Sequence, residues 1–274
     1  MDFKSLRFVR MIFEAPYRVK MYALSKKMYR EETLSMTPDE IERIEGYKDI
    51  HKGERCFIVL TGPSLTEKDL GLIRDEISFT VNSGYKAYGV NGWKPRYYVS
   101  MDGNEVAQDM LQTVLAGDYD IQGFFTSKNN PLSNGKLIKL PSDVSLIWRI
   151  DSILNALFPN KWMLGEMSKD ISKRVYNGKT VLCATLQIAS YMGFDAIYLL
   201  GADFNYTGMI LHSNLTPEEK KGKERDKTKV QTEMLIQIND FAAEAKRKGI
   251  CIYNATRGGN LECFERVDLD SIIS

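Results

Sequence analysis

From residue 55 onward the sequence predicts an α/β fold with a mainly parallel sheet. Short apolar runs typical of buried strands alternate with longer amphipathic stretches typical of helices, and turn residues separate the two. The composition agrees with a packed domain, because 43% of the 274 residues are hydrophobic, 27% are charged and only 8 are proline. The chain is therefore long and apolar enough to bury a sizeable core.

Charge and cysteine usage exclude several classes of protein. Lys and Arg number 37 against 36 Asp and Glu, so no overall positive field attracts the protein to DNA or RNA, and we expect no nucleic-acid partner. The four cysteines lie far apart without a C-x-x-C pair, so we expect no zinc site. The start lacks the pattern of a signal peptide, which makes a cytoplasmic location the default expectation.

The first thirty residues have a character of their own. Eight basic side chains face only Asp2 and Glu14, and apolar residues are interleaved with them on both sides of Pro16. Such a segment can lie on an anionic membrane, here the inner face of the cytoplasmic membrane, or pack on the main domain or on a second subunit of a homo-oligomer. Both alternatives stay open. We expect residues 1–50 to form a basic amphipathic helical extension and connector, and residues 51–274 to form the main domain.

Each element after the extension follows from its local pattern. Thr37 followed by Pro38 predicts the start of a connector helix, and Thr66 with Asp69 three residues later predicts a second helix start. Strands are predicted at residues 56–60, 77–82, 96–101, 121–126 and 137–140, with a helix at 105–115. The second half predicts a helix at 181–192 that stops at Gly193, a strand at 196–200, a charged helix at 217–248 and a strand at 250–253.

Polar clusters follow four of these strands, at residues 61–64, 82–83, 102–104 and 203–206. Ligands of parallel α/β sheets bind beyond the carboxyl ends of the strands, so we expect the binding site there. Gly62, Pro63 and Ser64 suit a loop that holds a phosphate near a helix start, although a tight turn alone also explains the glycine. Asp102 and Asp203 suit contacts to a ribose or to Mg²⁺, and Asp is equally common as a helix cap.

Only two histidines are available for acid–base chemistry. His51 precedes the first strand of the domain, whereas His212 lies in a polar loop together with Asn205, Tyr206 and Ser213. His212 is therefore the better candidate for a general base, with a plain surface residue as the alternative. The charged run at 218–229 is typical of a solvated helix face or of a lid over a site.

Several segments together resemble one superfamily. Their sequences are Phe57-Ile-Val-Leu-Thr-Gly-Pro-Ser-Leu65, Val81-Asn82, Tyr97-Tyr-Val-Ser-Met-Asp102, Ile197-Tyr-Leu-Leu-Gly-Ala-Asp-Phe204 and Tyr253-Asn-Ala-Thr256. The superfamily joins the bacterial sialyltransferases of lipooligosaccharide synthesis with the MptE-like group of archaeal hydroxymethyldihydropterin diphosphokinases and flagellin-glycosylation accessory proteins. The resemblance covers about residues 55–267. It implies a Rossmann-like, three-layer α/β/α transferase domain with a mainly parallel sheet, preceded here by the N-terminal helical extension.

The resemblance also implies roles for individual residues. The segment from Thr61 to Ser64 would lie under the nucleotide phosphate and sugar, and Asn82 would contact the nucleotide. Tyr206 would stabilise the departing phosphate, and His212 would accept the proton of the acceptor hydroxyl. The whole set of expected nucleotide contacts is Thr61, Gly62, Pro63, Ser64, Asn82, Asp102, Thr180, Asp203 and Asn205.

Three departures from the sialyltransferase pattern bear on the substrate. Thr61 and Asp102 stand where the sialyltransferases have Asn, and Thr180-Val181-Leu182 replaces their Thr-Ser-Gly helix opening. An acid at position 102 suits a Mg²⁺-bound triphosphate better than a metal-free CMP-sugar.

Three functions follow from the residues and the resemblance. The favoured one is a glycosyltransferase of surface-glycan or glycoprotein assembly, which transfers a sugar with inversion from a nucleotide donor, most plausibly a CMP-linked acidic sugar, to a glycan hydroxyl without a cofactor. The first alternative is a diphosphokinase of the hydroxymethylpterin type with Mg²⁺ at Asp102 and Asp203. Tyr85, Tyr88 or Trp93 could stack on the pterin, and a place in the core or at its rim explains these aromatic residues equally well. The second alternative is a non-catalytic nucleotide-binding accessory protein.

Overall fold

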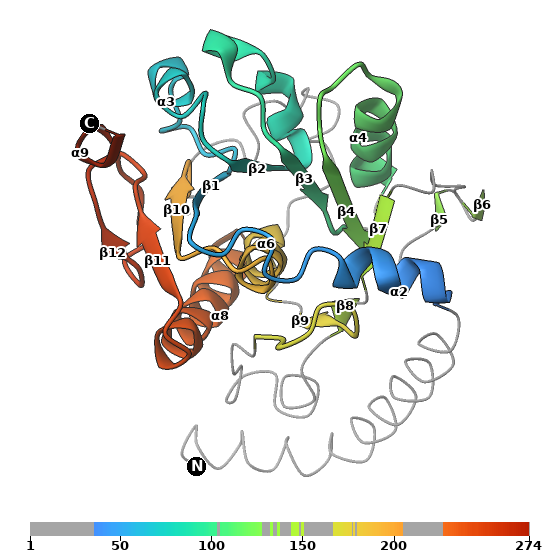
Figure 1. The fold of residues 1–274 in the computed structure, drawn as a ribbon. Helices are drawn as coiled ribbons and strands as arrows, with labels where there is room; N and C mark the ends of the chain where they lie inside the picture. Colours follow the sequence, from blue (N-terminus) through green and yellow to red (C-terminus); the bar gives the residue numbers. More distant parts are fainter. Residues whose placement is uncertain are drawn as a thin grey trace.

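The computed structural model describes residues 36–102, 105–127, 132–133, 136–137, 144–147, 149–150, 167–176, 178, 180–204 and 227–273. An eight-stranded sheet runs through its centre in the order β12-β11-β10-β1-β2-β3-β4-β7, and all of its neighbouring strands are parallel. Helices cover both faces, so the fold is the expected Rossmann-like, three-layer α/β/α arrangement (Figure 1).

The strands of the large sheet are short, which is usual for a parallel sheet buried on both faces. Their bounds are β1 Arg55–Val59, β2 Ser78–Val81, β3 Tyr97–Ser100, β4 Gly123–Ser127, β7 Val144–Ile147, β10 Ala196–Leu200, β11 Cys251–Asn254 and β12 Glu265–Arg266. Two small pairs lie outside this sheet. They are β5 Leu132–Ser133 with β6 Lys136–Leu137, antiparallel, and β8 Arg149–Ile150 with β9 Val175–Tyr176, parallel.

Figure 1 shows α3 and α4 on one side of the sheet and α2, α6 and α8 on the other. The helix bounds are α2 Pro38–Glu45, α3 Glu67–Leu72, α4 Glu105–Ala116, α6 Val181–Tyr191, α8 Lys227–Arg247 and α9 Leu269–Ile273, with 3₁₀ turns η1 Asn82–Ala87 and η2 Val90–Gly92.

Strand β1 shows why the apolar runs of this sequence are continuous. Cys56 and Ile58 belong to the large core under α6 and α8, whereas Phe57 and Val59 belong to a second core under α3. Because successive side chains of a strand point to opposite faces, a strand covered on both faces is apolar at every position.

Two helix starts that the sequence predicts are confirmed. Thr37 and Glu40 form a reciprocal capping box at α2, and Thr66 and Asp69 form another at α3. Helix α2 then packs on the domain, because Ile44 is fully buried and the guanidinium of Arg43 donates to the Val144 carbonyl at 3.3 Å.

The sheet changes its direction of growth at β1. The chain adds β2, β3, β4 and β7 on one side of β1, and it then returns to place β10, β11 and β12 on the other side. In open parallel sheets this reversal point is where the loops after two neighbouring strands part and a ligand can bind. The loops after β1 and β10 are therefore the centre of the candidate site.

Some elements differ from the sequence predictions. Of the strand expected at 137–140, the structure describes only Leu137, which belongs to β6 and pairs with β5 instead of the large sheet; β7, β12 and α9 were not predicted. Strand β12 has two exposed charged residues and forms by pairing with β11, so no apolar signal marks it. Residues 1–35, which include the basic segment, lie outside the described part of the chain. Among the described residues, no helix combines the length and the apolar character needed to cross a bilayer.

Candidate functional site

The loops after β1 and β10 are bonded directly to each other. The Gly62 amide donates to the Gly201 carbonyl at 3.0 Å. The hydroxyl and the amide of Ser64 both donate to Oδ2 of Asp203, at 2.8 and 3.3 Å. The structure thus brings together Gly62, Ser64 and Asp203, three residues that the sequence assigned to one site.

Glycine is required at this contact. A Cβ atom on Gly62 would lie 1.9 Å from Oδ2 of Asp203 and 2.3 Å from the Gly201 carbonyl, closer than real Cβ atoms approach. Asp203 is 7% exposed, and one of its carboxylate oxygens is occupied by Ser64. Asp203 therefore holds the two loops together.

A third loop, after β11, is bonded to the same residues; the three loops after β1, β10 and β11 together form one wall of the candidate site. The hydroxyl of Thr256 accepts from the Ala202 amide at 3.0 Å, and the Asn260 amide donates to the Asp203 carbonyl at 2.7 Å. A Cβ atom on Gly259 would lie 2.4 Å from that same carbonyl. The sequence analysis did not include this loop in the site. The adjacent glycines at 258 and 259, directly after a predicted strand, were the available signal.

Arg257 fastens the β11 loop to α3 and α9. Its guanidinium donates to Asp69 and to Asp270, at 2.6 Å in each case. The hydrogen bond that Arg257 donates to Asp69, followed by the one it donates to Asp270, raises the pKa of Arg257 above its usual value. Because Asp69 also caps α3, one carboxylate links the start of that helix to the wall of the site.

Asn82 carries the clearest sign of a missing contact. It follows β2 in the left-handed backbone region, with φ of 47°, and its carbonyl accepts from the Tyr98 hydroxyl at 2.9 Å. Its side-chain Oδ1 is buried, yet it meets no hydrogen-bond donor in the described part of the chain. Buried polar atoms are nearly always paired, so this acceptor is open to a donor from a bound ligand or from residues outside the described part of the chain.

Thr61 lies beside the turn that Asn82 begins. A Cβ atom on Gly84, two residues into this turn, would lie 3.6 Å from the Thr61 methyl group. Thr61 is half-buried, whereas Pro63 is exposed at the tip of its loop. A ligand that reaches Asn82 would therefore meet Thr61 on the way.

Asp102 and Thr180 lie at the same edge of the sheet. Asp102 follows β3 and is exposed. Thr180 caps the start of α6, where its side chain accepts from the Leu182 amide at 3.4 Å. The far end of α6 is tied to the segment that precedes β1, since the Asp49 amide donates to the Tyr191 carbonyl at 3.1 Å. The amino terminus of α6 consequently points to the carboxyl ends of the strands, where its dipole favours an anion.

The described residues were also compared with the needs of a Mg²⁺ ion. They contain no group of three or more His, Cys, Asp or Glu side chains arranged to hold a metal. Mg²⁺ on a nucleotide typically needs only one or two carboxylates, with phosphates and water as the other ligands. Asp102 fits that requirement, whereas Oδ2 of Asp203 is already bonded to Ser64.

Three predicted residues fall outside the described part of the chain. These are Asn205, Tyr206 and His212, so their roles stay predictions. His51 is described, and it is buried at the opposite end of the sheet between Glu54 and the Tyr97 hydroxyl, at 2.6 Å from each. Burial raises the pKa of Tyr97 to about 12. The histidine therefore serves packing in the core and takes no part in the candidate site.

The aromatic residues considered for pterin stacking are mainly structural. Trp93 is fully buried, and its indole donates to the Ser78 hydroxyl at 3.0 Å, so the expectation that it stacks on a ligand is wrong. Tyr85 packs edge-on against Tyr98 and Tyr119. The Tyr88 hydroxyl accepts from the Asp120 amide at 2.9 Å.

Comparisons with known proteins agree with this fold. A family model described as "6-hydroxymethylpterin diphosphokinase MptE-like" matches residues 32–209. The solved structure of the MAf glycosyltransferase from Magnetospirillum magneticum AMB-1 resembles this chain with a TM-score of 0.50 and 16% sequence identity. The similarity covers 85% of this chain but 38% of that chain, so this chain spans well under half of the larger protein. No functionally curated protein matches the sequence.

Proposed function

Since this chain belongs to the MptE-like family, we propose that it is a nucleotide-dependent transferase, and specifically a glycosyltransferase that uses a nucleotide-activated sugar. The acceptor would be a hydroxyl of a surface glycan or glycoprotein. The donor would bind over the carboxyl ends of β1, β2 and β3, with its phosphate near the Gly62 loop and the start of α6.

The observation that carries the proposal is Oδ1 of Asn82, which meets no donor among the described residues. It is a buried acceptor that directly follows the carboxyl end of β2, the strand next to β1. An amino group of a nucleobase or a ribose hydroxyl would supply the missing donor. Thr61 and the exposed Asp102 border the same edge and would contact the sugar of the nucleotide.

Sugar transfer is the favoured reaction for two reasons. The fold neighbour covering 85% of this chain is a protein titled a glycosyltransferase. In addition, one oxygen of Asp203 is bonded to Ser64, so a metal at this edge would depend mainly on Asp102.

The proposed mechanism is a single displacement with inversion at a CMP-linked acidic sugar. His212 would take the proton of the acceptor hydroxyl, while the Tyr206 hydroxyl stabilises the leaving phosphate, at about 2–4 kcal/mol for such a donor. The Gly62–Ser64 turn would shape the phosphate site without donating to it, because its amides and the Ser64 hydroxyl already donate to Gly201 and Asp203. His212→Ala should abolish transfer and leave nucleotide affinity nearly unchanged. A variant with near-wild-type turnover would remove His212 from the mechanism.

A second candidate function is a Mg²⁺-dependent diphosphokinase. The family description, which names such an enzyme, and the exposed Asp102 after β3 support it. Asp102 would then hold Mg²⁺ together with the phosphates of ATP. This candidate requires a metal for tight nucleotide binding, whereas the glycosyltransferase does not.

Calorimetric titration separates the two candidates. The full chain is titrated with CMP, CDP, UDP, GDP and ATP, each with and without Mg²⁺, and thermal midpoints are recorded in parallel. Binding of CMP or CDP without metal supports the glycosyltransferase, and turnover of CMP-sugars is then measured. Binding of ATP only with Mg²⁺ favours the diphosphokinase. Nucleotide binding without turnover of any donor, together with a stable protein partner, would favour the accessory role.

The location proposed for the protein is the cytoplasm, with residues 1–30 in contact with the anionic inner face of the membrane. Flotation with anionic vesicles compares the full chain with one lacking these residues. Equal flotation of the two proteins would exclude the contact, and self-association of the full chain alone would indicate a subunit interface.

A further inference from the structure

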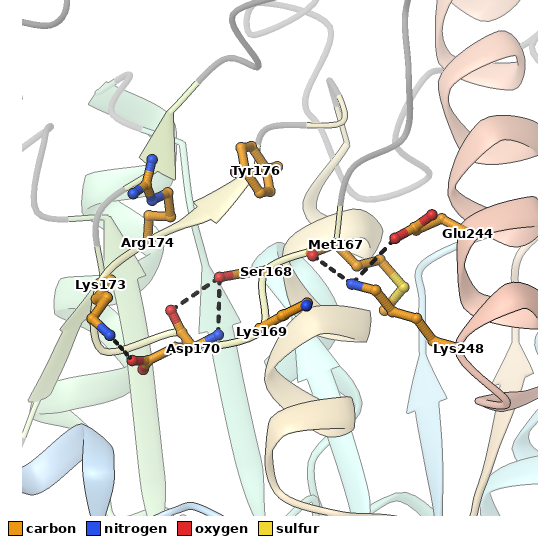
Figure 2. A pocket seen from close by; sticks show the side chains of 9 residues that line it. All are labelled: Met167, Ser168, Lys169, Asp170, Lys173, Arg174, Tyr176, Glu244 and Lys248. Atoms are coloured by element: carbon orange, nitrogen blue, oxygen red, sulfur yellow. Dashed lines mark hydrogen bonds and ion pairs between the residues drawn. The ribbon is translucent and has the colours of Figure 1, made fainter.

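A pocket of about 390 Å³ lies on the outer side of the α6 and α8 layer, between residues 167–176 and the end of α8 (Figure 2). Its wall includes Lys248, which follows α8 and comes shortly before the amino end of β11. The nucleotide loops follow the carboxyl ends of the strands. The pocket is therefore at the other end of the sheet and is separate from the candidate nucleotide site.

The pocket is built on firmly anchored backbone. Met167, Ile171 and Val175 are buried in the large core, with exposed fractions of 5%, 0% and 0%. The ammonium of Lys248 donates to the Met167 carbonyl at 2.7 Å, which joins α8 to residues 167–176 across the floor. Figure 2 shows this bond together with the pairs on either side.

Positive charge prevails in the lining. Two carboxylates are each paired with a lysine, Asp170 with Lys173 at 2.8 Å and Glu244 with Lys248 at 3.3 Å. The lining carries four cations against these two acids, namely Lys169, Lys173, Arg174 and Lys248 against Asp170 and Glu244. Counted over these lining residues alone, the formal charge is +2, which favours an anionic occupant.

Burial alone would raise the pKa of Asp170, but hydrogen bonds from Lys173 and Ser172 outweigh it and hold the pKa below its usual value. Burial would also raise the pKa of Glu244, but hydrogen bonds from Arg247 and Lys248 outweigh it and hold the pKa below its usual value. Both acids thus stay ionised and paired near neutral pH. The positive formal charge of the lining therefore does not depend on protonation of Asp170 or Glu244 near neutral pH.

We infer that this pocket binds a small anionic sugar, one that carries a carboxylate or a phosphate. Its volume is in the range of small-molecule sites, and Tyr176 and Met167 add ring and apolar surface beside the cations. Lys169 and Arg174 would contact the anion. The choice of a sugar rests on the proposed function, whereas the charge of the ligand follows from the lining itself.

Calorimetry at low ionic strength tests this site. The probes are glucuronate, glucose 6-phosphate, neutral glucose and inorganic phosphate, and the proteins are the full wild-type chain, Lys169→Glu/Arg174→Gln and the control Arg74→Gln. Arg74 is exposed and pairs with Asp75, and neither residue lines the pocket. We expect one of the two sugar anions to bind wild type and Arg74→Gln alike, and to bind the double variant at least about 10-fold more weakly. The tighter of the two identifies the anionic group.

Several results would overturn the inference. If the sugar anions bind the wild type and the double variant equally well, they bind outside this pocket. If neither anion binds the wild type with a Kd below about 10 mM, the pocket is not a binding site for them. If glucose binds as tightly as the sugar anions, the inference that the ligand must be anionic is wrong. If inorganic phosphate binds as tightly as the sugar anions, the inference that the ligand is a sugar is wrong. CMP affinity measured on the same proteins keeps the two proposals apart, because the double variant should bind CMP like wild type.

Discussion

The side-chain amide of Gln187 forms two hydrogen bonds with the backbone of Tyr176. Its Oε1 accepts from the Tyr176 amide and its Nε2 donates to the Tyr176 carbonyl, both at 2.9 Å. The same Oε1 also accepts from the Ser168 amide at 2.9 Å. Gln187 is fully buried on α6, which otherwise presents mainly apolar side chains. One amide therefore fastens residues 168–176 onto the core.

Gln187→Leu should destabilise the protein by about 2–4 kcal/mol, because it leaves backbone groups of Ser168 and Tyr176 buried without partners. Urea denaturation measures the loss. Ser190→Ala is the control, since the Ser190 hydroxyl donates to the Leu186 carbonyl of its own helix. A cost below about 0.5 kcal/mol for Gln187→Leu would mean that residues 168–176 are held by apolar contacts alone.

Asn82→Gly should weaken nucleotide binding about 10-fold while leaving stability nearly unchanged. Glycine accepts the left-handed φ of 47° at this position but removes the unpaired Oδ1. Asn91→Gly is a matched control, because Asn91 has φ of 49° and its side-chain amide is not left open but donates to the Glu67 carbonyl. Calorimetry with the best nucleotide gives the result. Unchanged affinity in Asn82→Gly would remove Asn82 from the binding site.

Gly259→Ala should cost about 2–4 kcal/mol, whereas Gly258→Ala should be nearly neutral. A Cβ at 259 would press on the Asp203 carbonyl at 2.4 Å from a backbone with φ of 78°, while a Cβ at 258 meets no heavy atom within 4 Å. Thermal and urea unfolding of both variants provide the comparison. Similar stabilities would show that the β11 loop shifts without cost and does not support the site.

Ser64 and Asp203 should show energetic coupling of about 1–2 kcal/mol in a double-mutant cycle. Ser64→Ala, Asp203→Asn and the double variant are compared by urea denaturation. The expectation follows from the hydroxyl–carboxylate bond of 2.8 Å that joins the two loops. Additive effects would mean that the Gly62 and Gly201 backbone contact alone holds the loops together.

Stability should fall with acid partly through Asp170. Hydrogen bonds from Lys173 and Ser172 outweigh the effect of burial and lower its pKa in the folded protein. Its contribution is therefore present above the unfolded pKa of about 4 and is lost as the pH falls through the lower folded pKa. Asp170→Asn keeps the oxygen that accepts from Ser172 and should flatten the loss of stability below about pH 4. Asp109→Asn, at an exposed site on α4, should keep the wild-type slope.

The fold and part of the site could be predicted from the sequence for a physical reason. Strand β10 coincides with its predicted range, and the capped starts of α2 and α3 were predicted, because these signals are local. The order β10-β1-β2 is not local, so the bond between Ser64 and Asp203 could not be foreseen, although both residues were assigned to one edge. Gln187 was missed for the same reason, since its partners Ser168 and Tyr176 lie in another segment.

The position of β1 between β2 and β10 also affects how the chain folds as it leaves the ribosome. Arg55 pairs with Ala196, so one edge of β1 stays without its partner until the last third of the chain has been made. At ordinary rates of translation this interval is on the order of 10 s. An apolar strand with an open edge is prone to pair with other chains during such a delay. Chaperones that bind unfolded chains should therefore raise the yield of folded protein most if they act while the segment between β1 and β10 is being synthesised.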